Sequence, residues 1–423
     1  MSSRKLSNQS NPMKKPRFTQ SLHNAIRNGE TEFLKKLLQY DFIQDIEATD
    51  EMGLKPLHVA LLCKNDEIAK LLIENGANVN AKSKEKQLLP EIRKTFEEIK
   101  YFYFKLTDIK KYYTKLTPLH IATINGSLKM VKMLVENGAS VNIKNICGLR
   151  PIHSAILSGS VEIVKELFQN GATIGKLKRS KELIGAEDLV NCATENGSLE
   201  IIKMLFQNDI KVEGRRAVHI AIDFGKKEIL KFLVKNGAVT YSDGETYPPL
   251  HRLDHDLEMV KFLLDNGADV EVFGGEDFEQ TLLHRATRYG DLKLVKLLIQ
   301  IGANIDCKSG PPHGDDEPPG DSTPLHFAIS KGRLEIADLL IKAGASVNIP
   351  NAKAKTALHC AVEHENGKMI QALIHNGANV EAWFDCEECE DTYRTCAPKP
   401  LEITLEEKKI NIMKTFLYVN LHK

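Results

Sequence analysis

Several features of membrane, secreted and nucleic-acid-binding proteins are missing from this chain of 423 residues. It has no apolar run approaching the roughly 20 residues that a transmembrane helix requires. The N-terminal residues MSSRKLSNQSNPMKKPRF lack the apolar core of a signal peptide. The 57 Lys and Arg residues equal the 57 Asp and Glu residues, so no overall charge favours nucleic acid or an acidic membrane. We therefore expect a cytoplasmic protein that binds neither nucleic acid nor a membrane.

Aromatic residues and cysteines are also sparse. Phe, Trp and Tyr make up 6% of the chain, with a single Trp. The eight cysteines are scattered, which favours free thiols in a reducing compartment over a disulfide framework. The segment 99–115, IKYFYFKLTDIKKYYTK, is an exception, because six of its 17 residues are aromatic and five are lysine.

The first 17 residues read as a separate segment. They include the basic run KKPR at 14–17, and no acidic residue occurs before Glu30. A polar segment of this kind buries too little apolar surface to fold by itself, which predicts a disordered basic tail over residues 1–17. Short basic runs also serve as nuclear import signals, so a nuclear location stays open beside the cytoplasmic one.

A short motif with a histidine recurs along the rest of the chain, as in TPLHIA at 117 and TPLHFA at 323. Its histidines are His58, His120, His153, His219, His251, His284, His326 and His359. Nearly all steps between them are one or two periods of 33 residues, once two insertions are allowed for. Most copies are followed about 17 residues later by NGA or a variant. Such a period predicts an array in which each unit buries its apolar face against its neighbours.

Each unit is predicted to contain two helices. In TPLHIATINGS, Thr117 can cap a short helix, and Pro118 takes the first helical position, where its missing N–H costs nothing. The next residues, LKMVKMLVENG, have the apolar spacing of a helix with a broad buried face. Gly138 can adopt the left-handed conformation that ends this second helix.

The TPLH and NGA elements, recurring in fixed phase, resemble the ankyrin repeat, and the resemblance covers almost the whole chain from about residue 18. It implies an all-α solenoid of helix-turn-helix units with β-hairpin fingers and, in this chain, one helical insertion. We count nine repeats in an array over 51–397, between a capping repeat over 18–50 and a degenerate capping repeat over 398–423. The resemblance also implies that each histidine is a structural hydrogen-bonding residue with partners in its own or the adjacent repeat.

The middle of the array departs most from the pattern. In the fourth repeat Asn191 takes the histidine position, and Asp209 takes the glycine position, where a left-handed cap is less favourable. The sixth repeat is two residues short between His251 and NGA. We therefore expect the array to be least regular between about 176 and 256, either as a bend that serves binding or as sequence drift.

Two insertions interrupt the period. In the first, 83–115, apolar residues at helical spacing follow Pro90 and predict a helix of about 17 residues. Four aromatic residues fall outside the apolar stripe of that helix and are candidates for a protein contact: Tyr101, Phe104, Tyr112 and Tyr113. Packing on neighbouring repeats is the alternative. The second insertion, at 308–321, is an acidic Pro/Gly-rich loop, either a plain flexible loop or a docking segment for a basic partner.

Catalytic and cofactor motifs are absent from the sequence. GATIGKL at 171–177 has one residue too few between its glycines for a phosphate-binding loop, and Leu177 stands where Ser or Thr must bind magnesium. No GxSxG elbow, protein-kinase signature or HExxH motif occurs. We therefore expect no enzymatic activity and no cofactor.

A weak candidate for a zinc site lies near the C-terminus. Cys386, Cys389 and Cys396 would supply three of the four ligands that zinc requires, with His375 or Cys360 as the fourth. The alternative is an acidic loop whose thiols have no function.

The resemblance implies that protein partners bind on the concave side, formed by the first helices and the fingers. The family's variable positions there are the two residues before the glycine that ends the first helix. Leu62, Ile124 and Leu157 would form an exposed apolar stripe, and Phe224, Arg288 and Tyr289 are of types enriched at interface hot spots. Arg252 and Arg285, one period apart, add positive charge. Packing between helices is the alternative for several of these side chains.

The sequence thus predicts a monomeric, non-enzymatic scaffold that binds one or more protein partners. One alternative is a substrate-recruiting adaptor for a ubiquitin ligase, which usually requires an appended box where this sequence has a degenerate repeat. The other is a nuclear regulatory inhibitor of transcription, which rests on the basic tail alone.

Overall fold

A computed structural model describes residues 16–39, 46–84, 115–145, 148–175, 185–210, 214–238, 248–253, 256–274, 280–310, 320–382 and 400. Within these ranges the regular structure is helical, apart from one isolated antiparallel bridge between Gly274 and Gln280. The chain is therefore an all-α protein. It divides into two compact units, residues 1–217 and 218–423.

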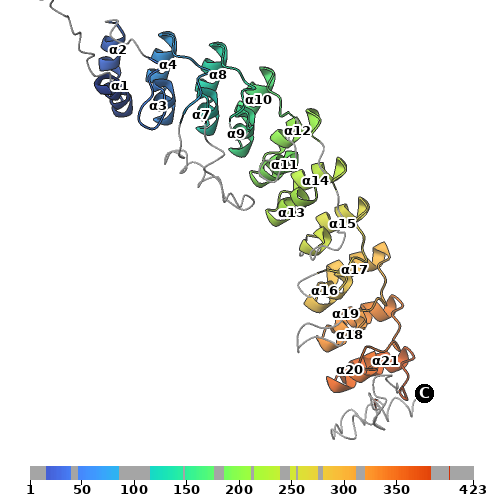
Figure 1. Ribbon diagram of the computed structural model, residues 1–423. Coiled ribbons are helices and arrows are strands. Elements are labelled where there is room, and N and C mark those ends of the chain that lie inside the picture. Colours follow the sequence, from blue (N-terminus) through green and yellow to red (C-terminus); the bar gives the residue numbers. More distant parts are fainter. Residues whose placement is uncertain are drawn as a thin grey trace, which may run out of the picture. The chain divides into compact units, whose positions relative to one another are not determined.

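The first unit consists of paired helices. In chain order these are α1 (Pro16–Asn28), α2 (Thr31–Gln39), α3 (Pro56–Leu62), α4 (Asp66–Glu74), α7 (Pro118–Ile124), α8 (Leu128–Glu136), α9 (Pro151–Leu157), α10 (Val161–Gln169), α11 (Ala186–Glu195) and α12 (Leu199–Gln207). The first helices α1, α3, α7, α9 and α11 pack side by side in that order (Figure 1). The second helices form another row, in which α2 packs on α4, and α10 packs on both α8 and α12.

The second unit repeats this arrangement. Its helices are α13 (Arg215–Asp223), which belongs to this unit from Val218 on, α14 (Lys227–Lys235), the 3-10 helix η1 (Pro249–Arg252), α15 (Leu257–Asp265), α16 (Leu282–Tyr289), α17 (Leu292–Ile301), α18 (Pro324–Ser330), α19 (Leu334–Lys342), α20 (Ala357–Glu363) and α21 (Gly367–His375). First helices α16, α18 and α20 pack in sequence, and so do second helices α14, α15, α17 and α19.

The second repeat shows how local sequence sets the helix ends. The side chain of Thr117 accepts a hydrogen bond from the N–H of His120, and Pro118 begins α7 as predicted. Gly138 has φ of +83°, which lets the N–H of Ala139 donate to the carbonyl of Leu134 at 2.9 Å and close α8. The Leu134 side chain is fully buried between the rows. Burying one such side chain contributes roughly 1.5–3 kcal/mol, so the buried face rather than helix propensity holds these short helices.

The irregularity expected in the middle of the array is confirmed in the described residues. Helix α11 begins at Ala186, three residues before the position of the proline in other repeats, because the Asp188 carboxylate accepts from the Gly185 N–H at 2.7 Å. Asn191 then lies inside the helix, buried, and its Oδ1 has no hydrogen-bond partner among the described residues. The sixth repeat has only the four-residue η1 as its first helix.

Asp209 behaves as a substitute for glycine. It adopts φ of +59°, and the N–H of Ile210 donates to the carbonyl of Leu205 at 3.1 Å, as the residue after glycine does elsewhere. The left-handed cap therefore forms in the fourth repeat despite the strain of a Cβ in this conformation.

The first insertion leaves and re-enters the array at one point. The N–H of Ser83 donates to the carbonyl of Leu116, and the N–H of Leu116 donates to Oγ of Ser83, both at 2.9 Å. Helices α3 and α7 are neighbours as a result, and Asn125 Nδ2 reaches the Leu61 carbonyl at 2.6 Å. The helix predicted within the insertion lies outside the described residues.

Gly274 is expected to tolerate no side chain. A Cβ there would lie 2.4 Å from Cδ of Pro248, the residue that precedes η1, and the proline ring cannot rotate away. We expect Gly274→Ala to destabilise the second unit by about 1–3 kcal/mol, measured by urea unfolding. Gly185→Ala is the matched control, because its Cβ would meet nothing nearer than 3.4 Å. Equal unfolding midpoints for the two variants would contradict this packing.

Candidate functional site

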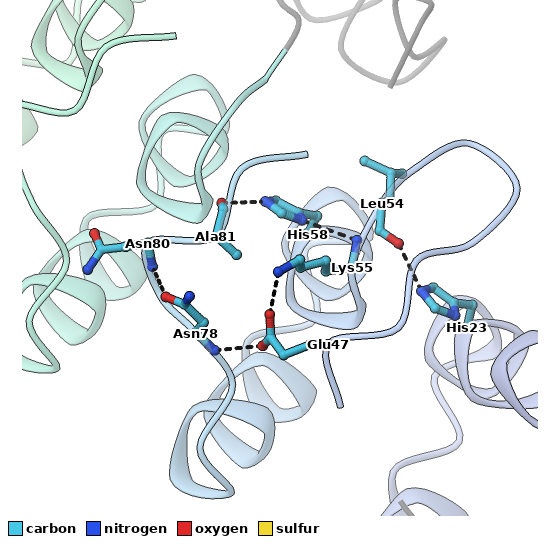
Figure 2. Close-up of polar contacts among 8 residues, drawn as sticks. All are labelled: His23, Glu47, Leu54, Lys55, His58, Asn78, Asn80 and Ala81. Atoms are coloured by element: carbon cyan, nitrogen blue, oxygen red, sulfur yellow. Dashed lines mark hydrogen bonds and ion pairs between the residues drawn. The ribbon is translucent and has the colours of Figure 1, made fainter. Parts of the chain in front are cut away.

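The repeated histidines are structural. In the first repeat His58 Nδ1 accepts from the Lys55 N–H at 3.2 Å, which leaves the proton on Nε2, and Nε2 donates to the Ala81 carbonyl at 3.1 Å (Figure 2). The same Nε2 bond to a carbonyl of the following loop recurs at His120, His153, His251, His284 and His326. The role that the resemblance implied for them is confirmed at these positions.

Burial sets the charge of these side chains. It lowers the pKa of His58, His120, His153, His251, His284 and His326 to about 4. They are neutral at neutral pH, and each has its Nε2 hydrogen-bonded to a backbone carbonyl.

His23 makes the same kind of hydrogen bond, although it is not one of the eight histidines that the sequence motif identified. It lies in the N-terminal capping pair, and its Nε2 is 3.0 Å from the Leu54 carbonyl (Figure 2). The signal was present in SLHNAI at 21–26, which has a leucine and a histidine in the positions of the TPLH motif.

Acidic and amide side chains join the loops of successive repeats. Glu47 accepts from the Asn78 N–H at 2.8 Å and pairs with Lys55 Nζ at 2.6 Å (Figure 2). One repeat on, Asn80 accepts from the Ser140 N–H at 2.8 Å and donates to the Gly138 carbonyl. Because these side chains already form hydrogen bonds between neighbouring repeats, we assign them a structural role.

The zinc candidates Cys386, Cys389 and Cys396 lie outside the described residues. Of the proposed fourth ligands, Cys360 is buried with its thiol pKa raised to about 12, and His375 is exposed. Among the residues that the structure describes, no cluster of three or more His, Cys, Asp or Glu could hold a metal ion. None of the described helices is long and apolar enough to cross a membrane.

The expected apolar stripe of the first unit is not an exposed surface. Ile124 is 3% and Leu157 is 6% exposed, and Leu62 is half-buried. Asn125 Nδ2 donates to the Leu61 carbonyl and Asn196 Nδ2 to the Leu157 carbonyl, so each of these first helices is joined to the one before it. The expectation of exposure is therefore wrong for Ile124 and Leu157, and the alternative of packing between helices holds. The four aromatic candidates Tyr101, Phe104, Tyr112 and Tyr113 lie outside the described residues.

The second unit exposes two aromatic side chains at the ends of its first helices. Phe224 follows the last residue of α13 and is 46% exposed. Tyr289 is the last residue of α16 and is 59% exposed. Both lie where the sequence predicted them, immediately before a glycine with positive φ.

Arginines around Tyr289 form a connected surface across several repeats. Arg252 Nη1 donates to both carboxylate oxygens of Asp223 at 2.8 Å, and Arg285 Nη1 donates to the backbone carbonyl that precedes Arg252. The guanidinium carbons of Arg285 and Arg288 lie 5.9 and 5.7 Å from the centroid of the Tyr289 ring.

One further arginine joins this surface. Arg333 Nε donates to the backbone carbonyl of Arg288 at 3.4 Å. We call Arg252, Arg285, Arg288, Tyr289 and Arg333 the arginine surface. The sequence predicted the first four, and the structure brings them together. The sequence analysis did not predict Arg333. The available signal was a cation at the N-cap of a second helix, a position that Asn65, Ser127 and Asp291 occupy in other repeats.

Comparison with protein families identifies the architecture. A family model described as ankyrin repeats (3 copies) matches residues 5–83, 93–178, 181–243 and 283–382. A second, described as ankyrin repeats (many copies), matches residues 250–299. The chain belongs to the ankyrin-repeat family. Ankyrin repeats mediate protein–protein interaction, so the arginine surface is a candidate binding surface of an ankyrin array.

Curated proteins resemble this ankyrin chain over short segments. A transient receptor potential cation channel subfamily A member 1 homolog of Caenorhabditis elegans is 30% identical over 121 residues, 29% of this chain and 8% of that protein. Palmitoyltransferase ZDHHC13 of Mus musculus is 40% identical over 87 residues, 20% of this chain and 14% of the relative. The B-cell lymphoma 3 protein homolog of Mus musculus is 33% identical over 104 residues, 23% of this chain and 22% of the relative. The chain thus spans less than a quarter of the length of each of these relatives.

Proposed function

We propose that this ankyrin array is a non-enzymatic scaffold whose second unit binds a protein partner through the ends of its first helices. The observation that carries the proposal is the exposure of Phe224 and Tyr289, with Arg285 and Arg288 against the Tyr289 ring. The family resemblance implies binding on the side that the first helices form, which supports this choice of edge.

The chemistry of these residues suits an interface hot spot. Aromatic side chains and arginine dominate the binding energy at protein interfaces, because they bury a large area and lose little conformational entropy. The arginines over Tyr289 hold its ring, each exposed cation–π contact contributing about 0.5–1 kcal/mol. A ring that is already held has less rotamer freedom to lose when a partner covers it.

Hydrogen bonds also hold the backbone next to Tyr289. Arg285 is tied to the carbonyl of His251, and His251 Nε2 bonds the Val272 carbonyl at 2.9 Å. The exposed side chains therefore project from a backbone held by part-buried hydrogen bonds, which supports a preformed binding site.

Phe224→Ala combined with Tyr289→Ala is expected to weaken partner binding by about tenfold or more, because hot-spot truncations typically cost at least 2 kcal/mol. The full chain and the variant are immobilised, captured proteins are quantified by mass spectrometry, and the affinity of each purified partner is then measured by calorimetry.

The matched control is Phe33→Ala combined with Ile301→Ala. Phe33 on α2 is 47% exposed and Ile301 at the end of α17 is 41% exposed, so a similar apolar area is removed from second helices. Unchanged recovery of every partner by the Phe224 and Tyr289 variant, with both variants folded, would refute binding at this edge.

A further inference from the structure

The zero net charge of this chain is the sum of opposite charges on its two units. Residues 1–217 contain 34 Lys and Arg against 25 Asp and Glu, a net charge of +9. Residues 218–423 contain 23 Lys and Arg against 32 Asp and Glu, a net charge of −9. Because electrostatic attraction depends on local charge, the balanced total does not exclude an anionic partner for the first unit.

The loops that follow α4, α8 and α10 in the first unit carry part of this positive charge. Their residues 77–84, 115–117, 137–150 and 170–175 contain no Asp or Glu. Of their five cations, the lysines are exposed and the arginine is half-buried. We call these five residues the basic loop surface: Lys82, Lys84, Lys115, Lys144 and Arg150. The segments 85–114 and 176–184, outside the described residues, add 11 Lys and Arg against 6 Asp and Glu, so the adjoining sequence is basic as well.

Beyond the binding role proposed for the second unit, we propose that the basic loop surface is a separate interaction surface, which binds an acidic segment of a partner protein along consecutive loops of the first unit. This inference does not use the ends of the first helices in the second unit, so either proposal can fail without the other.

Contacts between loops place these cations along neighbouring repeats. Lys82 Nζ donates to the Lys144 carbonyl at 3.0 Å, which joins the loops after α4 and α8. Arg150 Nη1 donates to the Thr173 carbonyl at 2.6 Å, which joins the loops after α8 and α10. These partners are uncharged, and within the described residues no carboxylate pairs with any of the five cations. The Nε of Arg150 is buried and has no hydrogen-bond partner there. The positive charges are therefore held in place but not neutralised.

One loop position explains why the charge is not neutralised. In the first repeat Glu47 accepts from the Asn78 N–H and also pairs with Lys55, the N-cap residue of α3 (Figure 2). Arg150 is the N-cap residue of α9, and Asn142, eight positions before it, accepts from an N–H of the next loop at 2.9 Å. The Asn142 amide makes the same structural hydrogen bond as the Glu47 carboxylate but brings no negative charge. The cation at this helix position is therefore neutralised in the first repeat and not in the third.

The same loop position differs between the two units. The first unit has Asn80 and Asn142 there, beside the basic loops. The second unit has Glu271 and Asp306, whose carboxylates accept from an N–H of the next loop at 2.7 and 2.9 Å. Since both residue types make the bond, the fold does not require the neutral residue in the first unit. An acidic segment is attracted to the loops of the first unit and repelled by those of the second.

The composition of the basic loop surface favours a protein segment over nucleic acid. The four loop ranges that supply it contain no Phe, Tyr or Trp, so they offer no ring on which a base can stack. Ankyrin repeats mediate protein–protein interaction, which favours a protein partner. Neighbouring helices pack roughly 8–10 Å apart and an extended chain advances about 3.3 Å per residue. An acidic residue at every third position of an extended segment would therefore meet successive loops.

The probe is a fluorescein-labelled peptide of about 12 residues with Glu at every third position and Ser and Gly between, compared with the same peptide carrying Gln for Glu. Fluorescence anisotropy with the full chain is expected to show at least tenfold tighter binding of the Glu peptide at low salt, decreasing as salt screens the charges. Lys84→Gln combined with Lys144→Gln is expected to weaken that binding at least fivefold. Both side chains are exposed and make no hydrogen bond or ion pair within the described residues, so this variant is expected to fold.

The matched control is Lys165→Gln combined with Lys203→Gln. It removes the same charge from exposed positions on α10 and α12 of the same unit and is expected to leave peptide binding unchanged. Adding Arg150→Gln to the Lys84 and Lys144 variant is expected to weaken binding at least twofold further, with circular dichroism confirming the fold. The charge swap Lys84→Glu combined with Lys144→Glu is expected to lose the Glu peptide and to bind a peptide that carries Lys at the same positions.

Equal binding of the Glu and Gln peptides, or an equal loss in the Lys165 and Lys203 control, would overturn the inference. So would tighter binding of a single-stranded oligonucleotide or of phosphatidylserine vesicles, or self-association of the chain that the Lys84 and Lys144 variant loses.

The two proposals are separated by Phe224→Ala combined with Tyr289→Ala, which is expected to leave binding of the Glu peptide unchanged. If that variant keeps every captured partner while the Glu peptide binds as expected, the proposed function fails and this inference stands. If the Glu peptide does not bind the wild-type chain, this inference fails whatever the second unit captures.

Discussion

Lowering the pH from 7.5 to 5.5 is expected to destabilise both units strongly. Burial lowers the pKa of His58, His120 and His153 in the first unit from 6.5 to about 4, and that of His251, His284 and His326 in the second unit likewise. Below pH 6.5 the unfolded chain binds protons at these side chains and the folded chain does not. Their contribution to stability is therefore complete above pH 6.5 and is lost as the pH falls towards 4.

The size of the effect follows from the number of histidines. Each one costs about 1.4 kcal/mol of folding free energy at pH 5.5, so three in one unit cost roughly 4 kcal/mol. A typical domain has only about 5–15 kcal/mol of stability, so the loss is a large share of the total.

Urea unfolding followed by circular dichroism at pH 8.5, 7.5, 6.5 and 5.5 measures this dependence. The midpoint is expected to be constant from pH 8.5 to 7.5 and to fall steeply by pH 5.5. Exposed carboxylates with lowered pKa, such as that of Glu258, titrate below this window and do not confuse the result. A midpoint that stays flat down to pH 5.5 would show that the histidines are not held neutral.

His120→Ala is expected to destabilise the first unit by about 2–4 kcal/mol. The ring accepts from the Thr117 N–H at 3.3 Å and donates to the carbonyl of Leu149, a residue only 1% exposed, at 3.1 Å. Alanine leaves the Thr117 N–H without this partner and removes one of two hydrogen bonds at the Leu149 carbonyl, which still accepts from the Asn145 N–H at 2.9 Å. It also leaves a cavity between two repeats, and both effects add to the cost. Urea unfolding at pH 7.5 provides the measurement.

The matched control is His364→Ala, at an exposed histidine after α20, where we expect a change below about 0.5 kcal/mol. One experiment tests both the pH dependence and the effect of His120→Ala. Because His120→Ala removes one of the titrating groups, its destabilisation is expected to be about 1.4 kcal/mol smaller at pH 5.5 than at pH 7.5. If the destabilisation by His120→Ala is the same at both pH values, the hydrogen bonds of His120 stabilise the fold but its titration does not explain the pH dependence.

Local sequence by itself determined the repeat architecture of this protein. Pro118 begins α7 and Gly138 ends α8 where TPLH and NGA predicted, because helix starts and left-handed ends depend on residues within one turn. The period also placed the histidines in equivalent environments, and the resemblance supplied their role. Even the irregular middle could be expected, since Asn191 and the shortened sixth repeat depart from the pattern in the sequence.

Burial and the composition of the surface were decided only by the tertiary structure. Ile124 and Leu157 take the first of the two variable positions and are buried, whereas Phe224 and Tyr289 take the second and are exposed. Arg333 joins Arg288 across a separation of 45 residues through a backbone carbonyl that no local pattern reveals. The physical reason is that helix boundaries arise from contacts within a few residues of sequence. Exposure and side-chain clustering arise instead from how each repeat packs against the next.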